Sequence, residues 1–507
     1  MSLCNWLAGG LALLALLGGC ASLPTDYEQH PSEAMTDTAD AQLGIAVAHW
    51  TAAHDGKSGF YPLPEGLDAL GARLALIDLA ERSIDMQYFL MKPDDAGLVL
   101  AEKLIQAADR GLRIRFLLDD IFTTVKDESL IALDDHPNIE IRLFNPVARG
   151  GIGWLNFLVD FKRANRRMHN KSFSVDNQVT IVGGRNIAEE YFQLKPVSEF
   201  VDFDVLGFGP VAAKVSETFD TFWNHPLAMP LLAFDPSPNS RPEYRANAAG
   251  TLDTSSESIY EKALKAPLVQ DLLQDRARLY PADAEVITDD PDKLLNKIST
   301  DHQVLVTRMA EIVDAAEREV IVISPYFIPG NEGVAYWKRI ADKGVRVIVL
   351  TNSLASTNHP AVHSAYSRYR EKLLAARVEL FEARANAVAR PPDTGEQLDT
   401  LTLHTKAVLI DGRYTFVGSL NLDPRSIDIN TEMGVLIDSA EMSAPLSTAI
   451  LRDLPMFSYR LALTDDQQLR WHAKIDGKQV TETSEPLAGG WLKLKAFLLK
   501  IVPESQL

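Results

Sequence analysis

The stretch "RMHNKSFSVD" (Arg167–Asp176) has a counterpart later in the chain, "TLHTKAVLID" (Thr402–Asp411). Each holds a His, a Lys two residues later and an Asp seven residues after the His, and a Gly and an Asn follow at matching distances. The five positions are His169, Lys171, Asp176, Gly183 and Asn186 in the first copy and His404, Lys406, Asp411, Gly418 and Asn421 in the second. Five spaced residues are not expected to recur by chance, so the pair indicates a duplication, or one site built in two halves.

The sequence around each motif repeats as well. Helical apolar spacing occurs at 66–83 and 96–111, and each helix pattern is followed by a buried-strand pattern, at 84–90 and 112–120. The later part repeats this order, with helices at 308–319 and 334–344 and strands at 320–328 and 345–353. Alternating strands and helices predict an α/β fold in each half, and therefore a pseudo-dimer of two α/β half-domains.

The same patterns give the expected domain boundaries. We predict half-domains at 58–225 and 300–460, a connector at 226–299 and a C-terminal helical extension at 461–507. The connector contains the turn-rich "FDPSPNSRPEYRANAAG" and some helical spacing. We interpret it as a surface insertion without chemistry.

The first 57 residues predict export and anchoring. The apolar run at 7–19 is too short to span a membrane comfortably and suits the core of a secretory signal. It ends in "LGGC", which resembles the lipobox of bacterial lipoproteins, so we expect a signal peptide at 1–19 and lipidation of Cys20. An uncleaved N-terminal anchor is the alternative. Residues 20–57 are polar and predict a flexible tether.

Cysteine content and net charge narrow the function classes. Cys4 and Cys20 are the only cysteines, which excludes a disulfide or a Cys-based metal site in the rest of the chain. The net charge is −19 and no basic stripe is visible, which disfavours nucleic acid as a tightly held partner. A single phosphate in a locally basic pocket remains compatible with this charge.

The duplicated residues suit phosphodiester chemistry. If His and Lys lie in a strand, residues two apart project to one face, and the sharp turn at each Gly brings the Asn to the same face. Two facing halves would then make one pocket with two His, two Lys and two Asn, and no carboxylate need enter it. Lys and Asn donate to phosphoryl oxygens, while one imidazole attacks phosphorus and the other protonates the leaving alkoxide. Zinc on the two His is disfavoured because the lysines repel a cation, so no metal or cofactor is called for.

These motifs resemble those of the phospholipase D superfamily, whose two-copy members carry H-x-K-x4-D followed by G-[GS]-x-N. The second copy continues as "GSLNLDPRSIDINTE" and the first reaches "FVDFDVLGFGP", both similar to the family pattern. The resemblance implies two phospholipase D-like halves that share one active site. It also implies that Asp202, with Asp204 as the fallback, orients His169 and that Glu432 orients His404. Asp176 and Asp411 are then expected to hold backbone rather than substrate.

A narrower resemblance concerns the substrates. "DMQYFL", "FNPVARGG", "VGGRNIAEEYF" and "VDFDVLGFGPV" are similar to the bacterial cardiolipin synthase C group, which transfers a phosphatidyl group from phosphatidylethanolamine or another phospholipid to phosphatidylglycerol. This implies a phosphohistidine mechanism with His169 as nucleophile and His404 as general acid, although near-symmetric halves leave the roles exchangeable. Membrane phospholipids are then the expected partners of a monomeric enzyme, and no accessory protein can be named.

Three alternatives stay open at this point. A phospholipase D-type hydrolase would use water as acceptor and release phosphatidic acid. A secreted nuclease is disfavoured by the acidic charge and the membrane anchor. An inactive lipid-binding scaffold would not need the second His.

Some further residues have two interpretations each. Arg166 and Arg167 precede the first motif and either contact a lipid phosphate or form surface ion pairs. His359 and His363 either line the cleft or are ordinary cap and surface residues. The segment "WLKLKAFLLKIV" at 491–502 either packs on the body as a last helix or lies on an anionic membrane surface.

Lipidation of Cys20 predicts a mature chain that begins at that residue, anchored in the bacterial cell envelope on the periplasmic side. Ser22 is not the Asp that favours inner-membrane retention in many bacteria, so the outer membrane is favoured. Mass spectrometry of the protein purified from membranes should find a diacylglycerol-modified N-terminal Cys20. An intact Met1 on the membrane-bound protein would exclude processing.

Overall fold

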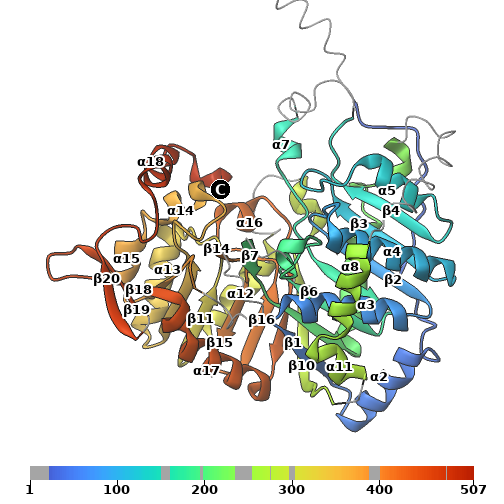
Figure 1. The fold of residues 1–507 in the computed structure, drawn as a ribbon, viewed down its shortest axis with the longest axis horizontal. Helices are drawn as coiled ribbons and strands as arrows, with labels where there is room; N and C mark the ends of the chain where they lie inside the picture. The colour runs from blue at the N-terminus through green and yellow to red at the C-terminus, as the bar shows by residue number, and fades with distance from the viewer. Residues whose placement is uncertain are drawn as a thin grey trace, which may run out of the picture.

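The computed structural model describes residues 22–149, 160–194, 198–234, 254–273, 276–295, 303–387, 400–475 and 477–507. Two α/β halves lie side by side, and their strands join in one mixed sheet of 18 strands (Figure 1). The predicted signal peptide and the lipidation site Cys20 lie outside the described residues.

The first half places three parallel strands beside three antiparallel ones. The parallel strands are β2 (Ser83–Tyr88), β3 (Arg113–Asp119) and β4 (Ile139–Phe144). The antiparallel strands are β5 (Ser172–Val175), β6 (Val179–Gly183) and β8 (Asp204–Phe208). Because β5 pairs with β2, the order is β4–β3–β2–β5–β6–β8, with β9 (Ala228–Pro230) outside β4.

The second half repeats this order strand for strand. Its parallel strands are β11 (Glu319–Ile323), β12 (Arg346–Asn352) and β13 (Glu379–Ala383). Its antiparallel strands are β15 (Ala407–Ile410), β16 (Tyr414–Gly418) and β17 (Met433–Asp438). β15 pairs with β11 as β5 pairs with β2, so the predicted pseudo-dimer of half-domains is confirmed.

Two strands join the halves at the centre of the sheet. β1 (Ser58–Leu63) pairs with β8, and β10 (Tyr280–Thr288) pairs first with β1 and then with β17. β10 belongs to the segment that we interpreted as a surface insertion. Its strand instead completes the edges of both halves, because each inner edge would otherwise leave backbone groups unpaired.

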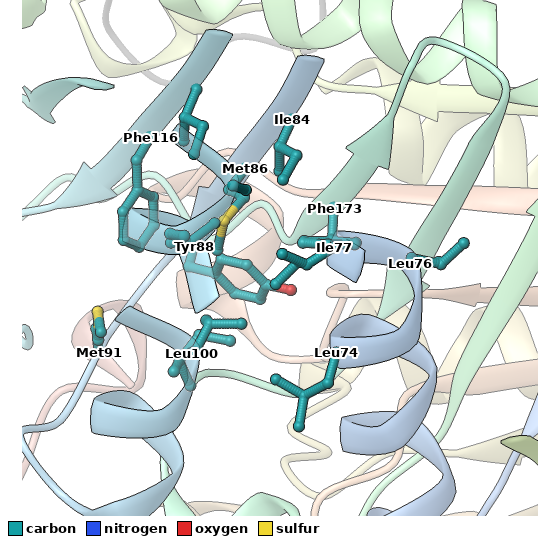
Figure 2. Packing of buried hydrophobic residues seen from close by; sticks show 14 of the residues in the cluster. Leu74, Leu76, Ile77, Ile84, Met86, Tyr88, Met91, Leu100, Phe116 and Phe173 are labelled. Atoms are coloured by element: carbon teal, nitrogen blue, oxygen red, sulfur yellow. The ribbon is translucent and has the colours of Figure 1, made fainter. Parts of the chain in front are cut away.

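Helices cover both faces of the first half. α3 (Gly66–Leu79) and α4 (Asp95–Asp109) lie on one face, and α8 (Pro210–Trp223) lies on the other. Figure 2 shows the core under α3 and α4, where Ile84, Met86 and Tyr88 of β2 meet Leu74 of α3 and Leu100 of α4. The period-two alternation of β2 turns these side chains to one face.

The second half is covered in the same way. α13 (Gly330–Asp342), α14 (Pro360–Tyr366) and α15 (Arg370–Ala375) pack on the face that carries Val320 and Val322. α17 (Ala440–Phe457) packs on the opposite face, against Ile321 and Ile323. None of the helices in the described ranges combines the length and apolar character needed to cross a bilayer.

Shorter or peripheral elements complete the described chain. The helices are α2 (Gln42–Ala53), α5 (Asp127–Asp134), α7 (Phe161–Ala164), α10 (Thr254–Leu264), α11 (Pro267–Leu273), α12 (Val304–Asp314), α16 (Pro424–Asp428) and α18 (Gly490–Leu499). The 3-10 turns are η1 (Glu189–Tyr191), η2 (Leu231–Phe234), η4 (Pro291–Leu294) and η6 (Glu504–Gln506). A separate parallel pair joins β7 (Ser198–Val201) of the first half to β14 (Thr400–Leu403) of the second.

The structure differs from the predicted tether at residues 22–57. The Gln29 side chain donates to the Ala228 carbonyl (3.1 Å), and the Ala34 amide donates to Asp220 on α8 (2.8 Å). α2 follows and buries Leu43 and Val47. Hydrogen bonds and a few buried apolar residues therefore hold this segment against the first half.

The predicted helical extension is also wrong over much of its length. Three strands occupy much of its first part: β18 (Ser458–Leu463), β19 (Leu469–Ile475) and β20 (Lys478–Glu482). They continue the sheet as antiparallel neighbours beyond β13, where they cover its outer edge. Among the described residues after 460, only α18 and η6 are helical.

Candidate active site

The two motif aspartates shape the turns that follow β5 and β15. Asp176 and Asp411 both have positive φ, and each carboxylate accepts three backbone amides at the start of a parallel strand. Asp176 accepts from residues 81, 82 and 83, and Asp411 accepts from residues 317, 318 and 319, all at 2.8–3.0 Å. Both carboxylates therefore hold backbone.

Each motif His lies just before its strand rather than within it, because β5 begins at Ser172 and β15 at Ala407. Backbone hydrogen bonds to the opposite half hold these His residues. The His169 amide donates to the Thr431 carbonyl (3.0 Å), and the His404 amide donates to the Val201 carbonyl (2.8 Å). Each His is thus positioned by the other half of the chain.

The carboxylates that orient the imidazoles cross between the halves. Nδ1 of His169 lies 2.8 Å from a Glu432 oxygen, and Nδ1 of His404 lies 2.6 Å from a carboxylate oxygen of Asp202. The expected pairing of Asp202 with His169 and of Glu432 with His404 is therefore wrong. Val201 and Thr431 accept the backbone hydrogen bonds from the two motif His residues. The residue that follows each of them, Asp202 or Glu432, therefore meets the imidazole of the opposite half.

The fallback Asp204 reaches neither His. Its carboxylate binds the Arg73 guanidinium at 2.8 Å, and both side chains are buried. Asp204 is therefore part of a structural ion pair inside the first half.

The crossed contacts explain one difference between the two motifs. A Cβ at Gly184 would lie 2.1 Å from an Asp202 oxygen, so the first half needs Gly at this position. The second half has Ser419, whose hydroxyl donates to Glu432. In both halves, an imidazole that donates from Nδ1 to a carboxylate keeps the lone pair of Nε2 free for chemistry.

Each motif lysine contacts the backbone of its own motif His. Nζ of Lys171 donates to the His169 carbonyl (2.6 Å), and Nζ of Lys406 donates to the His404 carbonyl (2.5 Å). Nζ of Lys406 also lies 2.8 Å from Nδ1 of His404. Both lysines are buried, so they place positive charge close to the rings.

Both asparagines face the same cavity as the two His. Asn186 donates to the Tyr191 hydroxyl (2.9 Å), while the carboxamide oxygens of Asn186 and Asn421 are buried without a hydrogen-bond partner among the described residues. Buried polar atoms normally have a partner, so these two oxygens are available to accept a hydrogen bond from a ligand.

The cavity has a volume of about 460 Å³ and is lined from both halves. The first half contributes Phe89, Leu90, Phe122 and Tyr191 around a Lys92–Glu190 ion pair. The second half contributes a more polar wall that consists of Tyr326, Asn358, His359, Val362, Asp423, Arg425, Ser426, Asn430, Gln506 and Leu507. The sequence did not require a carboxylate in the pocket, but two carboxylates, Glu190 and Asp423, line it.

Aromatic side chains that the motif analysis missed hold the two rings. Phe89 meets His169 edge to face (4.8 Å between ring centroids), and Phe200 stacks on His404 (5.1 Å). Tyr191 meets the edge of His404 (5.0 Å). In the sequence, Phe89 has a counterpart in the second half, Phe327, and this repeat was the only signal that could have pointed to an aromatic residue at the site.

Two further candidate residues are structural. Arg167 is buried and binds Asp119, and His363 is buried between the Asn352 carbonyl and Arg370. Arg166 donates to the Lys293 carbonyl. His359 does line the cavity.

Burial sets the charge of the cationic groups. It lowers the pKa of His169 well below its usual range, helped by Lys171, and lowers the pKa of His404 to about 3, helped by Lys406. It also lowers the pKa of Lys171 to about 7 and that of Lys406 to about 8. Near neutral pH both imidazoles of the free protein are therefore neutral.

The two carboxylates differ in pKa. Burial acts to raise the pKa of Asp202, but its interaction with His404, which includes a hydrogen bond, and the positive charge of Lys406 outweigh it, so the pKa is lowered. Burial raises the pKa of Glu432 to about 7. Asp202 is thus ionised at neutral pH, while Glu432 is close to its midpoint.

Comparison with known proteins adds a family and near full-length relatives. The model of the family "Cardiolipin synthase, PLD-like domain" matches twice, at residues 74–223 and 309–454. Cardiolipin synthase C of Escherichia coli K12 is 35% identical over 91% of this chain and 98% of its own length. Cardiolipin synthase A of Pseudomonas syringae is 27% identical over 77% of this chain and 67% of its own length.

The fold has a solved counterpart. The crystal structure of phosphatidylserine synthase from Haemophilus influenzae Rd KW20 superposes with a TM-score of 0.52 at 14% identity. The match covers 82% of this chain and 92% of that protein, so the likeness shows a shared fold of both halves.

The lowered lysine pKa values predict an alkaline loss of activity. A protonated Lys stabilises a bound phosphoryl group and a neutral Lys does not, so kcat/KM on a short-chain, water-soluble phospholipid should fall as pH rises through about 7 to 8. In Lys171→Arg the guanidinium stays charged, so the fall should begin at higher pH even if turnover is lower. If the original protein and Lys171→Arg lose kcat/KM over the same alkaline pH range, Lys171 does not titrate in that range.

Proposed function

Because the chain belongs to the phospholipase D superfamily, as a phosphatidyltransferase similar to the cardiolipin synthases, we propose that it makes cardiolipin. The donor is phosphatidylethanolamine or phosphatidylglycerol, and the acceptor is the free hydroxyl of phosphatidylglycerol. The observation that carries this proposal is a cavity lined by two imidazoles, one from each half, each bound to a carboxylate. A buried lysine contacts the backbone of each of these His residues. The near full-length similarity to a cardiolipin synthase C supports the choice of lipids.

In the first step, Nε2 of His169 attacks the phosphorus of the donor. An N–P bond forms, the P–O bond to the head group breaks, and the leaving alkoxide takes a proton from His404. Protonated His404 is disfavoured in the free protein, and the negative charge of a bound phosphodiester raises its pKa. Lys171 and Lys406 stabilise the charge on the phosphoryl oxygens.

The carboxylates support this assignment of roles. Asp202 is ionised, so it stabilises the imidazolium that His404 must become as general acid. Glu432 has a raised pKa and stabilises a positive charge on His169 less, which suits a ring that must stay neutral to attack.

In the second step, neutral His404 accepts the proton of the acceptor hydroxyl, and the alkoxide attacks phosphorus. The P–O bond forms, the P–N bond breaks and His169 is regenerated. A lipid alcohol competes with water only if the site positions it and limits access of solvent. The two differing walls of the cavity, aromatic in the first half and polar in the second, offer separate surfaces for the departing and arriving head groups.

We also propose that the enzyme works in the cell envelope, anchored through a lipid on Cys20. This follows from the "LGGC" sequence, and it would keep the protein close to phospholipid in the plane of the membrane. The outer membrane is favoured over the inner one by Ser22.

The crossed pairing predicts opposite effects of removing the two carboxylates. A phosphatidyl substrate with a good leaving group, such as p-nitrophenol, needs no general acid in the first step. Asp202→Asn weakens His404 as a base, so the second step should slow by about 10²–10⁴-fold and a radiolabelled phosphoenzyme should accumulate after a burst. Glu432→Gln keeps the Asp202–His404 pair, so its phosphoenzyme should turn over and little label should accumulate, and His169→Ala should form no phosphoenzyme.

The measurement is the amount of label bound to protein after an alkaline quench, since phosphohistidine is labile in acid. Circular dichroism and the melting temperature verify that each variant is folded. Pairing within each half would give the reverse pattern, with label accumulating in Glu432→Gln and not in Asp202→Asn.

The nature of the acceptor is tested with the purified protein in vesicles that contain phosphatidylethanolamine and phosphatidylglycerol. Cardiolipin should be the main product, with ethanolamine released in step and phosphatidic acid minor, as measured by lipid mass spectrometry. His404→Ala is the inactive control. Mainly phosphatidic acid with free head group would make the protein a hydrolase, and no product from a folded protein would favour the scaffold interpretation.

A further inference from the structure

α18 carries an apolar face that no described part of the protein covers. Trp491, Phe497 and Ile501 are 76%, 65% and 88% exposed, and Leu494 and Leu498 are about half exposed or more. At 100° per residue, the four of these side chains that belong to α18 occupy an arc of about 120° on one side of the helix, and Ile501 follows just beyond its end. Half of the exposed large hydrophobic residues in the described chain lie between 487 and 501. Such a concentration marks an interaction surface.

The opposite face of α18 already has a structural role. Ala496 is buried, and its carbonyl accepts the Ser364 hydroxyl of α14 at 2.5 Å. Leu492 and Leu499 on the same side are partly buried. Both sequence interpretations of this segment thus find support: one face packs on the body and the other remains free for a partner.

The charge of the segment indicates what that partner is. Residues 490–502 contain Lys493, Lys495 and Lys500 and no Asp or Glu, in a chain whose net charge is −19. The lysines flank the apolar arc on both sides by the same helical spacing. A helix with a bulky apolar stripe, a terminal Trp and lysines along its flanks fits the interface of a bilayer that contains anionic lipid.

The position of α18 ties this surface to the active site. It packs on α14, which begins directly after His359, a residue of the cavity wall. Beyond α18 the chain runs through η6 to Gln506 and Leu507, which also line the cavity. In Figure 1, α18 and the C-terminal end lie along the upper edge of the molecule, while α2 lies at its lower right.

We propose that α18 is an interfacial docking helix, which lays its exposed face into the headgroup region of an anionic bilayer and holds the mouth of the cavity against the lipid surface. The inference rests on the proposed function in that it takes a bilayer phospholipid as the substrate. It adds a lipid contact that is independent of any N-terminal anchor, and it gives a partner to the apolar face of α18 that points away from α14.

Contact is measured directly with a local probe. In the full-length chain carrying Cys4→Ser and Cys20→Ser, Leu498→Cys provides a single thiol for a polarity-sensitive fluorophore. Vesicles of phosphatidylethanolamine and phosphatidylglycerol should shift its emission to the blue, and a lipid-borne quencher should reduce it several-fold. Ile45→Cys on α2, which is 49% exposed, is the matched control and should show neither change.

A charge test and an activity test accompany the probe. Replacing all three lysines by Gln should weaken binding to anionic vesicles by about tenfold or more, and binding to uncharged vesicles much less. Trp491→Glu with Phe497→Glu should lower turnover on vesicles at least about tenfold more than turnover on a soluble short-chain substrate. The control Ile45→Glu should not lower turnover on vesicles more than turnover on the soluble substrate.

The outcomes separate this inference from the proposed function. A probe at 498 that stays in water on vesicles overturns the docking helix, and so does a spectral change that depends on protein concentration without vesicles, because a second copy would then cover the face. The probe also works in the inactive His169→Ala protein. Insertion together with phosphatidic acid as main product would therefore support docking and reject cardiolipin synthesis.

Discussion

Two reciprocal hydrogen bonds across the seam, from the His169 amide to Thr431 and from the His404 amide to Val201, decide how the site is assembled. Each bond aligns a strand-like segment of one half with the motif of the other, and the next residue of that segment is the carboxylate that binds the imidazole. Hydrogen bonds to charged groups contribute roughly 1.5–3 kcal/mol each, so the docking of the halves and the orientation of the rings stabilise one another. A half-domain alone would hold an imidazole without its carboxylate, which is a physical reason to keep both copies in one chain.

The same arrangement explains how so many ionisable groups are buried together. An isolated buried charge is costly, and the protein responds by lowering the pKa of both lysines and both imidazoles. Both imidazoles are therefore neutral in the free protein near neutral pH, and Lys171 is close to its midpoint. An anionic phosphodiester reverses this balance, because its charge favours the protonated lysines and the imidazolium. Binding of substrate thus creates the charge state that the chemistry needs.

Much of the fold was predictable from the sequence because it rests on local periodicity and on the duplicated motif. The α/β halves and the cavity residues His169, Asn186, His404 and Asn421 follow from these patterns. The crossed pairing of Asp202 and Glu432 with the two His residues could not be predicted, because spacing along a chain does not say which half an acidic residue faces. The strands at 458–482 and β10 were missed for a similar reason, since their partners are edges that exist only once the sheet has formed.

The two copies have also diverged where they meet, and the divergence follows the crossed contacts. Gly184 leaves room for the short Asp202, which binds His404, whereas Ser419 donates to the longer Glu432, which binds His169. The first pair holds an ionised carboxylate against its ring, and the second holds a carboxylate whose pKa is raised to about 7. A symmetric site would give both rings the same basicity, but a two-step transfer needs one ring to stay neutral and attack while the other gains and loses a proton. The opposite pKa shifts of the two carboxylates, set by burial at Glu432 and by the contacts with His404 and Lys406 at Asp202, therefore separate two roles that the duplication first made equal.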